Sequence, residues 1–184
     1  PFTMGVAEEL ESRGVPIGKF RPVIQHVIPP KPVDIDTNEE SRTEWKRAAR
    51  EARNLQANEA RKSCRTRMTM NIAREFRNDT WYLPFSYDYR GRAYPIPSFL
   101  TPQDTDFGKS LLISDKGALI TDEGKDWLSF SVATCFGLDK ASWQERIDWC
   151  RDTQNQALIG RVACEPLRYI GDWENVDEPW QFLA

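Results

Sequence analysis

The longest helical pattern in the chain covers residues 39–77, EESRTEWKRAAREARNLQANEARKSCRTRMTMNIAREFR. In its first half, apolar side chains recur at the i, i+3, i+4 and i+7 spacing of one helical face, at Trp45, Ala48, Ala49 and Ala52. The pattern weakens at residues 54–58 and resumes over about residues 59–77. We therefore expect two consecutive helices, the first of which starts near Glu39 or Ser41.

The same segment carries most of the positive charge. Residues 42–77 hold eleven Lys or Arg against four Asp or Glu, whereas residues 98–184 hold eight against fifteen. Because the net charge of the whole chain is only -3, the local field decides what each part can bind. The candidate phosphate-binding residues of these helices are Arg42, Lys46, Arg50, Arg53, Arg61, Lys62 and Arg65. The alternative is an ordinary solvated helix face.

Residues 1–38 precede the helical pattern and are rich in proline. The run from Val27 to Pro32 cannot be helical, because each proline removes an amide donor and biases the residue before it towards extended geometry. We expect residues 1–38 to form an extended connector. Capping side chains between Asp34 and Asn38 then favour a helix start.

Aromatic and β-prone residues replace the helical pattern at residue 80. Residues 81–85 and 92–96 predict two short strands joined by a turn, and residues 110–114 predict a third. After residue 120 the pattern is helical again, with caps at Thr121 and Ser142 and a stop at Gly137. The chain is therefore expected to be mainly α with a small antiparallel β element near residues 80–115.

The turn DYRGRAY, residues 88–94, is the sharpest candidate site. Arg90 and Arg92 flank Gly91, so the backbone there can approach a ligand closely while guanidinium groups fork onto phosphate oxygens. Tyr94 can stack on a base or sugar, and Asp88 can hold one arginine in place. The alternative is a surface turn closed by a salt bridge.

Composition excludes several classes of protein. The 184 residues allow one domain or two small subdomains, and no run approaches ~18 apolar residues, so no membrane span is expected. Four cysteines without a C-x-x-C pair, and a single distant histidine, argue against a zinc site and fit a reducing cytoplasm. The chain lacks a signal pattern, and its last residues, 180–184, lie inside an apolar run. We expect it to be a piece of a longer protein.

Residues 88–92 resemble the D-x-x-G-R motif of phage-type single-subunit RNA polymerases. Flanking strings of that family follow in the same order, over about residues 20–184. They are PVDID, EWKRAA and ARKS before the motif, and GKSLL, EGKDWL, GLDK and ERI after it. The resemblance implies thumb-like basic helices at residues 39–78, the start of the palm at residues 79–120, and a helical palm insertion at residues 121–184.

The resemblance also implies roles for single residues. Arg90, Arg92 and Tyr94 would contact the template and the RNA–DNA hybrid, with Asp88 as the orienting carboxylate, and Lys109 would contact the template. The parent enzyme would transcribe DNA into RNA from nucleoside triphosphates with two Mg²⁺ ions, in the cytoplasm of a phage-infected host. Its metal-binding aspartates lie further downstream in the family. We therefore expect no catalytic or metal-binding residue in this chain, and no activity from it alone.

Two other functions are compatible with the residues. One is a stand-alone nucleic-acid-binding module. The other is a protein-interaction domain that uses the seven tryptophans as exposed anchors, which burial of Trp127, Trp143 and Trp149 in one core would argue against. In the polymerase interpretation, the partners are the DNA template, the RNA–DNA hybrid, nucleoside triphosphates and the remainder of the polymerase.

Overall fold

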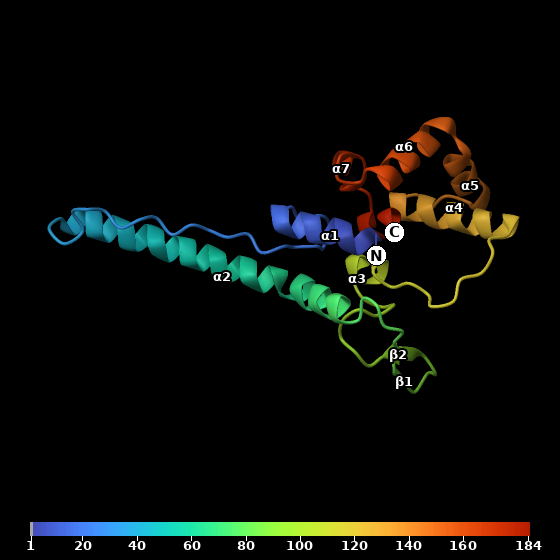
Figure 1. The fold of residues 1–184 in the computed structure, drawn as a ribbon, viewed down its shortest axis with the longest axis horizontal. Coiled ribbons are helices and arrows are strands. Elements are labelled where there is room, and N and C mark those ends of the chain that lie inside the picture. The colour runs from blue at the N-terminus through green and yellow to red at the C-terminus, as the bar shows by residue number, and fades with distance from the viewer. Residues whose placement is uncertain (1) are drawn as a thin grey trace.

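A single helix of 37 residues, α2 (Glu39–Glu75), dominates the computed structural model, which describes residues 2–184 (Figure 1). At 1.5 Å per residue it is roughly 55 Å long. It projects from a group of shorter helices that contains both ends of the described chain (Figure 1). The Asn38 side chain caps it by accepting hydrogen bonds from the amides of Glu40 and Ser41.

The expectation of two helices between residues 39 and 77 is wrong, because α2 continues through residues 54–58. Asn54 and Asn58 are exposed, so their side chains stay in solvent and need not break the backbone pattern. Between them, the side chain of Gln56 accepts a hydrogen bond from the amide of His26, which lies in a neighbouring segment. Tertiary contact therefore supports the helix where its local signal is weakest.

That neighbouring segment, residues 21–32, runs antiparallel to α2 along its length, and we call it the strap (Figure 1). Three hydrogen bonds fasten it to the helix. The amide of Arg21 donates to Thr66 Oγ1 over 2.9 Å, the amide of His26 donates to Gln56 Oε1 over 2.8 Å, and Trp45 Nε1 donates to the carbonyl of Pro29 over 2.9 Å. The strap is extended, as predicted. Side chains of α2 form hydrogen bonds with its backbone, in place of the neighbouring strand that a β-sheet would provide.

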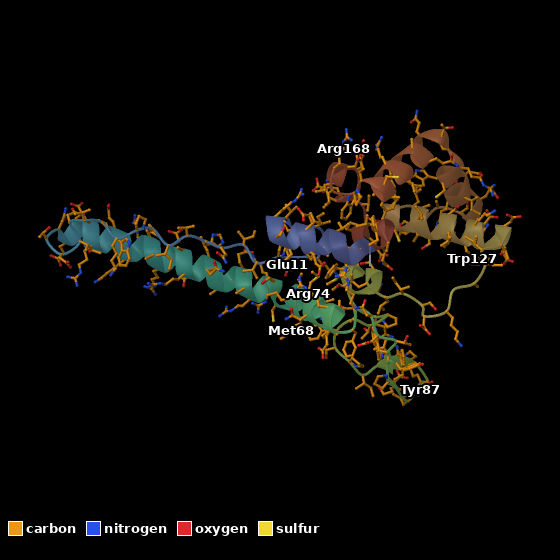
Figure 2. The ribbon with its side chains drawn as sticks, in the orientation of Figure 1. Glu11, Met68, Arg74, Tyr87, Trp127 and Arg168 are labelled. Carbon is orange, nitrogen blue, oxygen red and sulfur yellow. The ribbon has the colours of Figure 1, made fainter. Side chains whose placement is uncertain are left out.

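The beginning of the predicted connector is not extended, because Phe2–Arg13 forms helix α1; Pro1 lies outside the described residues. No proline interrupts residues 2–13, and Met4, Ala7 and Leu10 are buried on one face. Carboxylates on the helix face the end of α2, where Arg74 pairs with Glu8 and Glu11 (Figure 2). The prediction of an extended connector was based on the prolines later in the segment, and it therefore missed this apolar helical face.

The β element is a two-stranded antiparallel hairpin, β1 (Phe85–Tyr87) and β2 (Ala93–Pro95), with Ser86 opposite Tyr94. A small antiparallel β element was expected, and the structure confirms it. The third strand expected at residues 110–114 is wrong, since helix α3 (Asp106–Ser110) occupies its start. The Thr105 side chain caps α3 by accepting from the amide of Gly108.

The acidic part of the chain folds into five further helices, α4 (Asp122–Phe136), α5 (Trp143–Arg151), α6 (Thr153–Cys164), α7 (Ile170–Trp173) and α8 (Pro179–Leu183). The predicted caps are confirmed. Thr121 caps α4, Ser142 forms a capping box with Glu145 at the start of α5, and Gly137 ends α4 with a φ of 131°.

Trp180 lies at the centre of the core. Its fully buried ring packs against Phe20, Phe107 and Trp173 at centroid separations of 4.9, 4.7 and 5.7 Å. Its Nε1 donates to the carbonyl of Ile17, and the Asp106 carboxylate accepts from the Trp180 and Gln181 amides. The apolar residues 180–183 thus pack onto earlier parts of the chain. No helix within residues 2–184 has the length and apolarity that a membrane crossing requires.

Candidate nucleic-acid interface

Asp88 organises the loop at the tip of the hairpin. Its Oδ1 accepts hydrogen bonds from the amides of Arg90 and Arg92 over 2.8 and 3.0 Å, and its Oδ2 accepts from Arg92 Nε over 2.7 Å. The backbone closes the loop, because the amide of Asp88 donates to the carbonyl of Arg92 and the amide of Gly91 to that of Asp88. Gly91 has a φ of 77°, a left-handed conformation that a side chain disfavours.

The loop leaves its two arginines in different states. Arg92 forms an ion pair with Asp88 at 2.6 Å and lies 5.6 Å from the ring of Tyr94, so its direction is fixed. Arg90 makes no ion pair within residues 2–184 and stacks on the exposed ring of Tyr89 at 5.2 Å. A Cβ atom added at Gly91 would have no other atom within 4 Å, so the backbone between Arg90 and Arg92 is open to a ligand.

Hydrogen bonds hold Asp88 in its charged form. The backbone amide of Arg92, with that residue's side chain and the amide of Arg90, lowers the pKa of the Asp88 carboxyl below its ordinary value, against a smaller opposing effect of burial. The carboxylate is therefore ionised at neutral pH and keeps the Arg92 guanidinium oriented. The predicted roles of Asp88 as an orienting group and Gly91 as the open position are consistent with this geometry.

The basic residues of α2 do not share one face. With roughly 100° of rotation per residue, Arg42 and Arg53 are only about 20° apart, whereas Arg65 is turned roughly 120° from Arg53. The side chains on the shared face are exposed and make no ion pair within residues 2–184; they are Arg42, Lys46, Arg50 and Arg53. We call these four residues the basic row.

The other predicted cations of this region are in different settings. Arg61 is exposed, while Lys62 forms an ion pair with Glu59 one turn away at 3.1 Å. Arg65 forms an ion pair with the buried carboxylate of Asp104 at 2.6 Å. Lys109 is half-buried in α3, beside the buried Phe107 and Gly108. The predicted cations therefore do not form one continuous basic patch in the structure.

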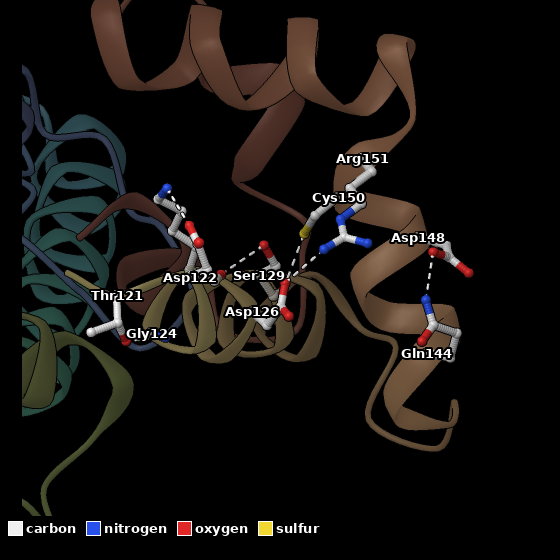
Figure 3. Close-up of polar contacts among 10 residues, drawn as sticks. Thr121, Asp122, Gly124, Asp126, Ser129, Gln144, Asp148, Cys150 and Arg151 are labelled. Carbon is white, nitrogen blue, oxygen red and sulfur yellow. Dashed lines mark hydrogen bonds and ion pairs between the residues drawn. The ribbon is translucent and has the colours of Figure 1, made fainter.

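Several carboxylates of the acidic part stabilise the fold. Around α4 and α5 they cap helices and pair with nearby cations, as in the Asp126–Arg151 ion pair at 2.8 Å and the bond from Gln144 to Asp148 (Figure 3). In the part of the chain that the structure describes, no three His, Cys, Asp or Glu side chains cluster in a way that could hold a metal ion.

The sequence did not indicate one feature of this region, and it left open the exposure of the tryptophans. Asp104 is a buried acceptor between α2 and α3, and its only sequence signal is its place one residue before the capping Thr105. An aromatic cluster of Trp127, Phe130 and Trp143 is partly open on α4 and α5, with Trp127 54% exposed and centred 4.4 Å from Trp143. Trp149 instead packs against the core, so the three tryptophans considered above do not share one core.

Comparison with known proteins gives one consistent family. A family model described as DNA-dependent RNA polymerase matches residues 119–184. T7 RNA polymerase of Escherichia phage T7 is 37% identical over 173 residues, which are 92% of this chain and 19% of the phage protein. The DNA-directed RNA polymerase of Enterobacteria phage T3 is 33% identical over 97% of this chain, and the mitochondrial DNA-directed RNA polymerase of Neurospora crassa is 32% identical over 85%. The chain spans 20% and 11% of the lengths of these last two relatives.

Proposed function

Because this chain belongs to the family of phage-type single-subunit RNA polymerases, we propose that it is the part of a DNA-directed RNA polymerase that holds the DNA template and the RNA–DNA hybrid. The parent protein would then transcribe DNA from nucleoside triphosphates. The phage relatives favour action in the cytoplasm of an infected host, although the Neurospora relative is mitochondrial. In this proposal α2 belongs to the thumb, and the hairpin and α3 begin the palm.

One observation carries the proposal. Arg92 is aimed by Asp88 at the tip of an exposed loop, next to Arg90, which has no carboxylate partner among the described residues. Asp88 engages Nε and Nη2 of Arg92, so the Nη1 donors remain available for a phosphate oxygen. The rings of Tyr89 and Tyr94 beside the two guanidinium groups offer faces for a sugar or base.

The basic row would supply further contacts to the phosphates of the nucleic acid. Its four side chains are exposed on one face of α2 and are not neutralised by ion pairs within residues 2–184. Each cation that meets a phosphate releases counterions, so binding would be dependent on salt and independent of base sequence. Such a grip suits a polymerase, which must hold every sequence that it transcribes.

The chemistry itself would need residues beyond this chain. Phosphoryl transfer by the parent enzyme would use Mg²⁺, which stabilises the attacking and leaving oxygens. The carboxylates described here do not fit such a site: Asp104 and Asp106 accept backbone amides in the core, and Asp126 is paired with Arg151. We expect purified chain, mixed with Mg²⁺ and nucleoside triphosphates, to make no RNA.

Titration of the chain against a labelled RNA–DNA hybrid tests the grip. Affinity should fall steeply between low and moderate salt, and Arg90→Ala with Arg92→Ala should weaken it about tenfold and reduce the salt slope by roughly 2. The matched control is Arg151→Ala with Arg168→Ala, which removes two exposed, ion-paired arginines of the acidic part. A flat salt response, or equal losses in both double variants, would contradict the proposal. In the parent polymerase, the Arg90 and Arg92 changes should raise abortive or slipped products.

The aromatic cluster favours a second role for the acidic part. Trp127 and Leu128 are 54% and 56% exposed, and Trp143 is 38% exposed, which is unusual for large apolar side chains at neighbouring positions. We propose that the remainder of the polymerase covers this surface. Trp127→Ala should then leave affinity for the hybrid unchanged while weakening the association of this segment with the rest of the enzyme.

A further inference from the structure

Asp104 is the junction at which three parts of the molecule meet. Its carboxylate is fully buried, and its Oδ2 accepts a hydrogen bond from the amide of Leu100 over 2.8 Å. Its Oδ1 accepts from the amide of Thr105, which caps α3, and from Arg65 of α2. Leu100 has a φ of 55°, a left-handed conformation that only a fixed neighbourhood sustains in a residue with a side chain.

Arg65 reaches this junction with the Nε and Nη2 atoms of its guanidinium. Its Nε and Nη2 donate to Asp104 Oδ1 over 3.1 and 2.6 Å, and Nη2 also donates to the carbonyl of Ser98 over 3.3 Å. Its guanidinium lies 5.4 Å from the ring of Phe99. Arg65 therefore holds the segment that returns from the hairpin through Nε and Nη2, while its Nη1 makes no hydrogen bond within residues 2–184.

The same segment connects to the other candidate contacts. Gln103 Nε2 donates to the carbonyl of Ala93 in β2 over 3.1 Å, which links the junction to the hairpin. On the other side, Gly108 of α3 packs so closely on Asp104 that an added Cβ would lie 2.5 Å from its carboxylate. Lys109 follows directly, so the placement of its backbone depends on the same carboxylate.

We propose that Arg65 and Asp104 are positioning residues that fix the direction of α2 relative to the hairpin and Lys109, so that the basic row and the Arg90–Arg92 loop meet the same duplex. This inference rests on the proposed function, and it replaces the expectation that Arg65 itself binds phosphate. The helix has no other anchor to the hairpin of this kind among the described residues. A buried carboxylate with a forked partner gives one geometry, where a Lys–Asp pair would allow several.

The Asp104→Asn variant separates the two roles of Arg65. It keeps the size of the side chain, leaves the charge of Arg65 in place and makes the chain less acidic. If Arg65 binds phosphate, affinity for an RNA–DNA hybrid should be unchanged or higher. If Arg65 positions α2, affinity should fall at least about fivefold, because two patches that are presented together bind more strongly than two that move independently.

Two further variants, Arg65→Lys and Arg61→Gln, test the same inference. Arg65→Lys keeps the charge and loses the fork, so a positioning role predicts weaker binding with the salt slope of the wild type, and a phosphate contact predicts wild-type affinity. Arg61→Gln is the reference for the loss of one exposed cation and should lower the slope by about 0.9. Affinities for Asp104→Asn and Arg65→Lys that match the wild type would overturn the inference.

A distance measurement tests the junction without any nucleic acid. Spin labels at the exposed Cys64 of α2 and at Tyr87→Cys of the hairpin, in a Cys164→Ser background, should give one narrow distance distribution. Asp104→Asn and Arg65→Lys should broaden or shift it while circular dichroism stays unchanged. An unchanged distribution would overturn the inference. Wild-type chain that shows the narrow distribution but does not bind the hybrid would refute the proposed function and leave the junction standing.

Discussion

The projecting arm and the helical core of this molecule are held together by different means. The arm consists of the strap and the part of α2 from Glu39 to Thr66, and hydrogen bonds through Thr66, Gln56 and Trp45 join the two. The core instead encloses Trp173 and Trp180 completely, with aromatic rings on several sides. An exposed, charged helix can thus be supported by a few contacts with an extended segment, whereas most of the stability comes from apolar burial in the core.

The largest expected effect is in the core. Trp180→Ala removes the ring that fills the centre of the molecule, and large-to-small changes of this type cost about 3–5 kcal/mol in the free energy of unfolding. Urea unfolding followed by circular dichroism measures the loss. The matched control, Trp127→Ala, truncates a ring that is 54% exposed and should change the free energy of unfolding by about 1 kcal/mol or less. Similar losses for both would show that the core is not where the stability lies.

A smaller and more local effect is expected in the arm. Trp45→Ala removes the hydrogen bond to the carbonyl of Pro29 and the ring beside Lys31, at a cost of about 1 kcal/mol. The strap should then open locally, so the amide of His26 should exchange with solvent faster in hydrogen-exchange mass spectrometry. The amide of Trp180 serves as the internal control and should keep its protection. Equal acceleration at both amides would mean that arm and core unfold as one unit.

The smallest expected effect is a difference in pKa between two carboxyl groups, those of Asp88 and Asp106. Hydrogen bonds from Arg92 lower the pKa of Asp88 in the exposed loop, whereas burial raises the pKa of Asp106 in the core. The Asp88 contribution to stability is therefore present above its unfolded pKa of about 3.9 and is lost as pH falls, while that of Asp106 is present below this pKa and is lost as pH rises through its folded value. Carbon-detected NMR titration should give midpoints on opposite sides of 3.9. Reversed midpoints would contradict both the hydrogen bonding described for Asp88 and the dominant effect of burial at Asp106.

The two regions also differ in how well the sequence predicts them. Around α4 and α5, Thr121, Gly137 and Ser142 act through bonds within one or two turns, so local chemistry alone locates the helix ends, and the structure confirms all three. Helix α1 and the unbroken course of α2 were missed. Both depend on partners far away in the chain, since α1 docks on Arg74 and α2 is supported at Gln56 by the amide of His26.

The candidate site divides in the same way. The order of residues from Asp88 to Tyr94 by itself determines a closed loop with two guanidinium groups beside a glycine, because every bond that shapes it lies within five residues. Only the tertiary structure decides that Arg65 turns to Asp104, 39 positions later, instead of joining the basic row. The physical reason is that helical periodicity fixes the direction of a side chain relative to its helix, whereas its partner is set by which distant segment is buried there.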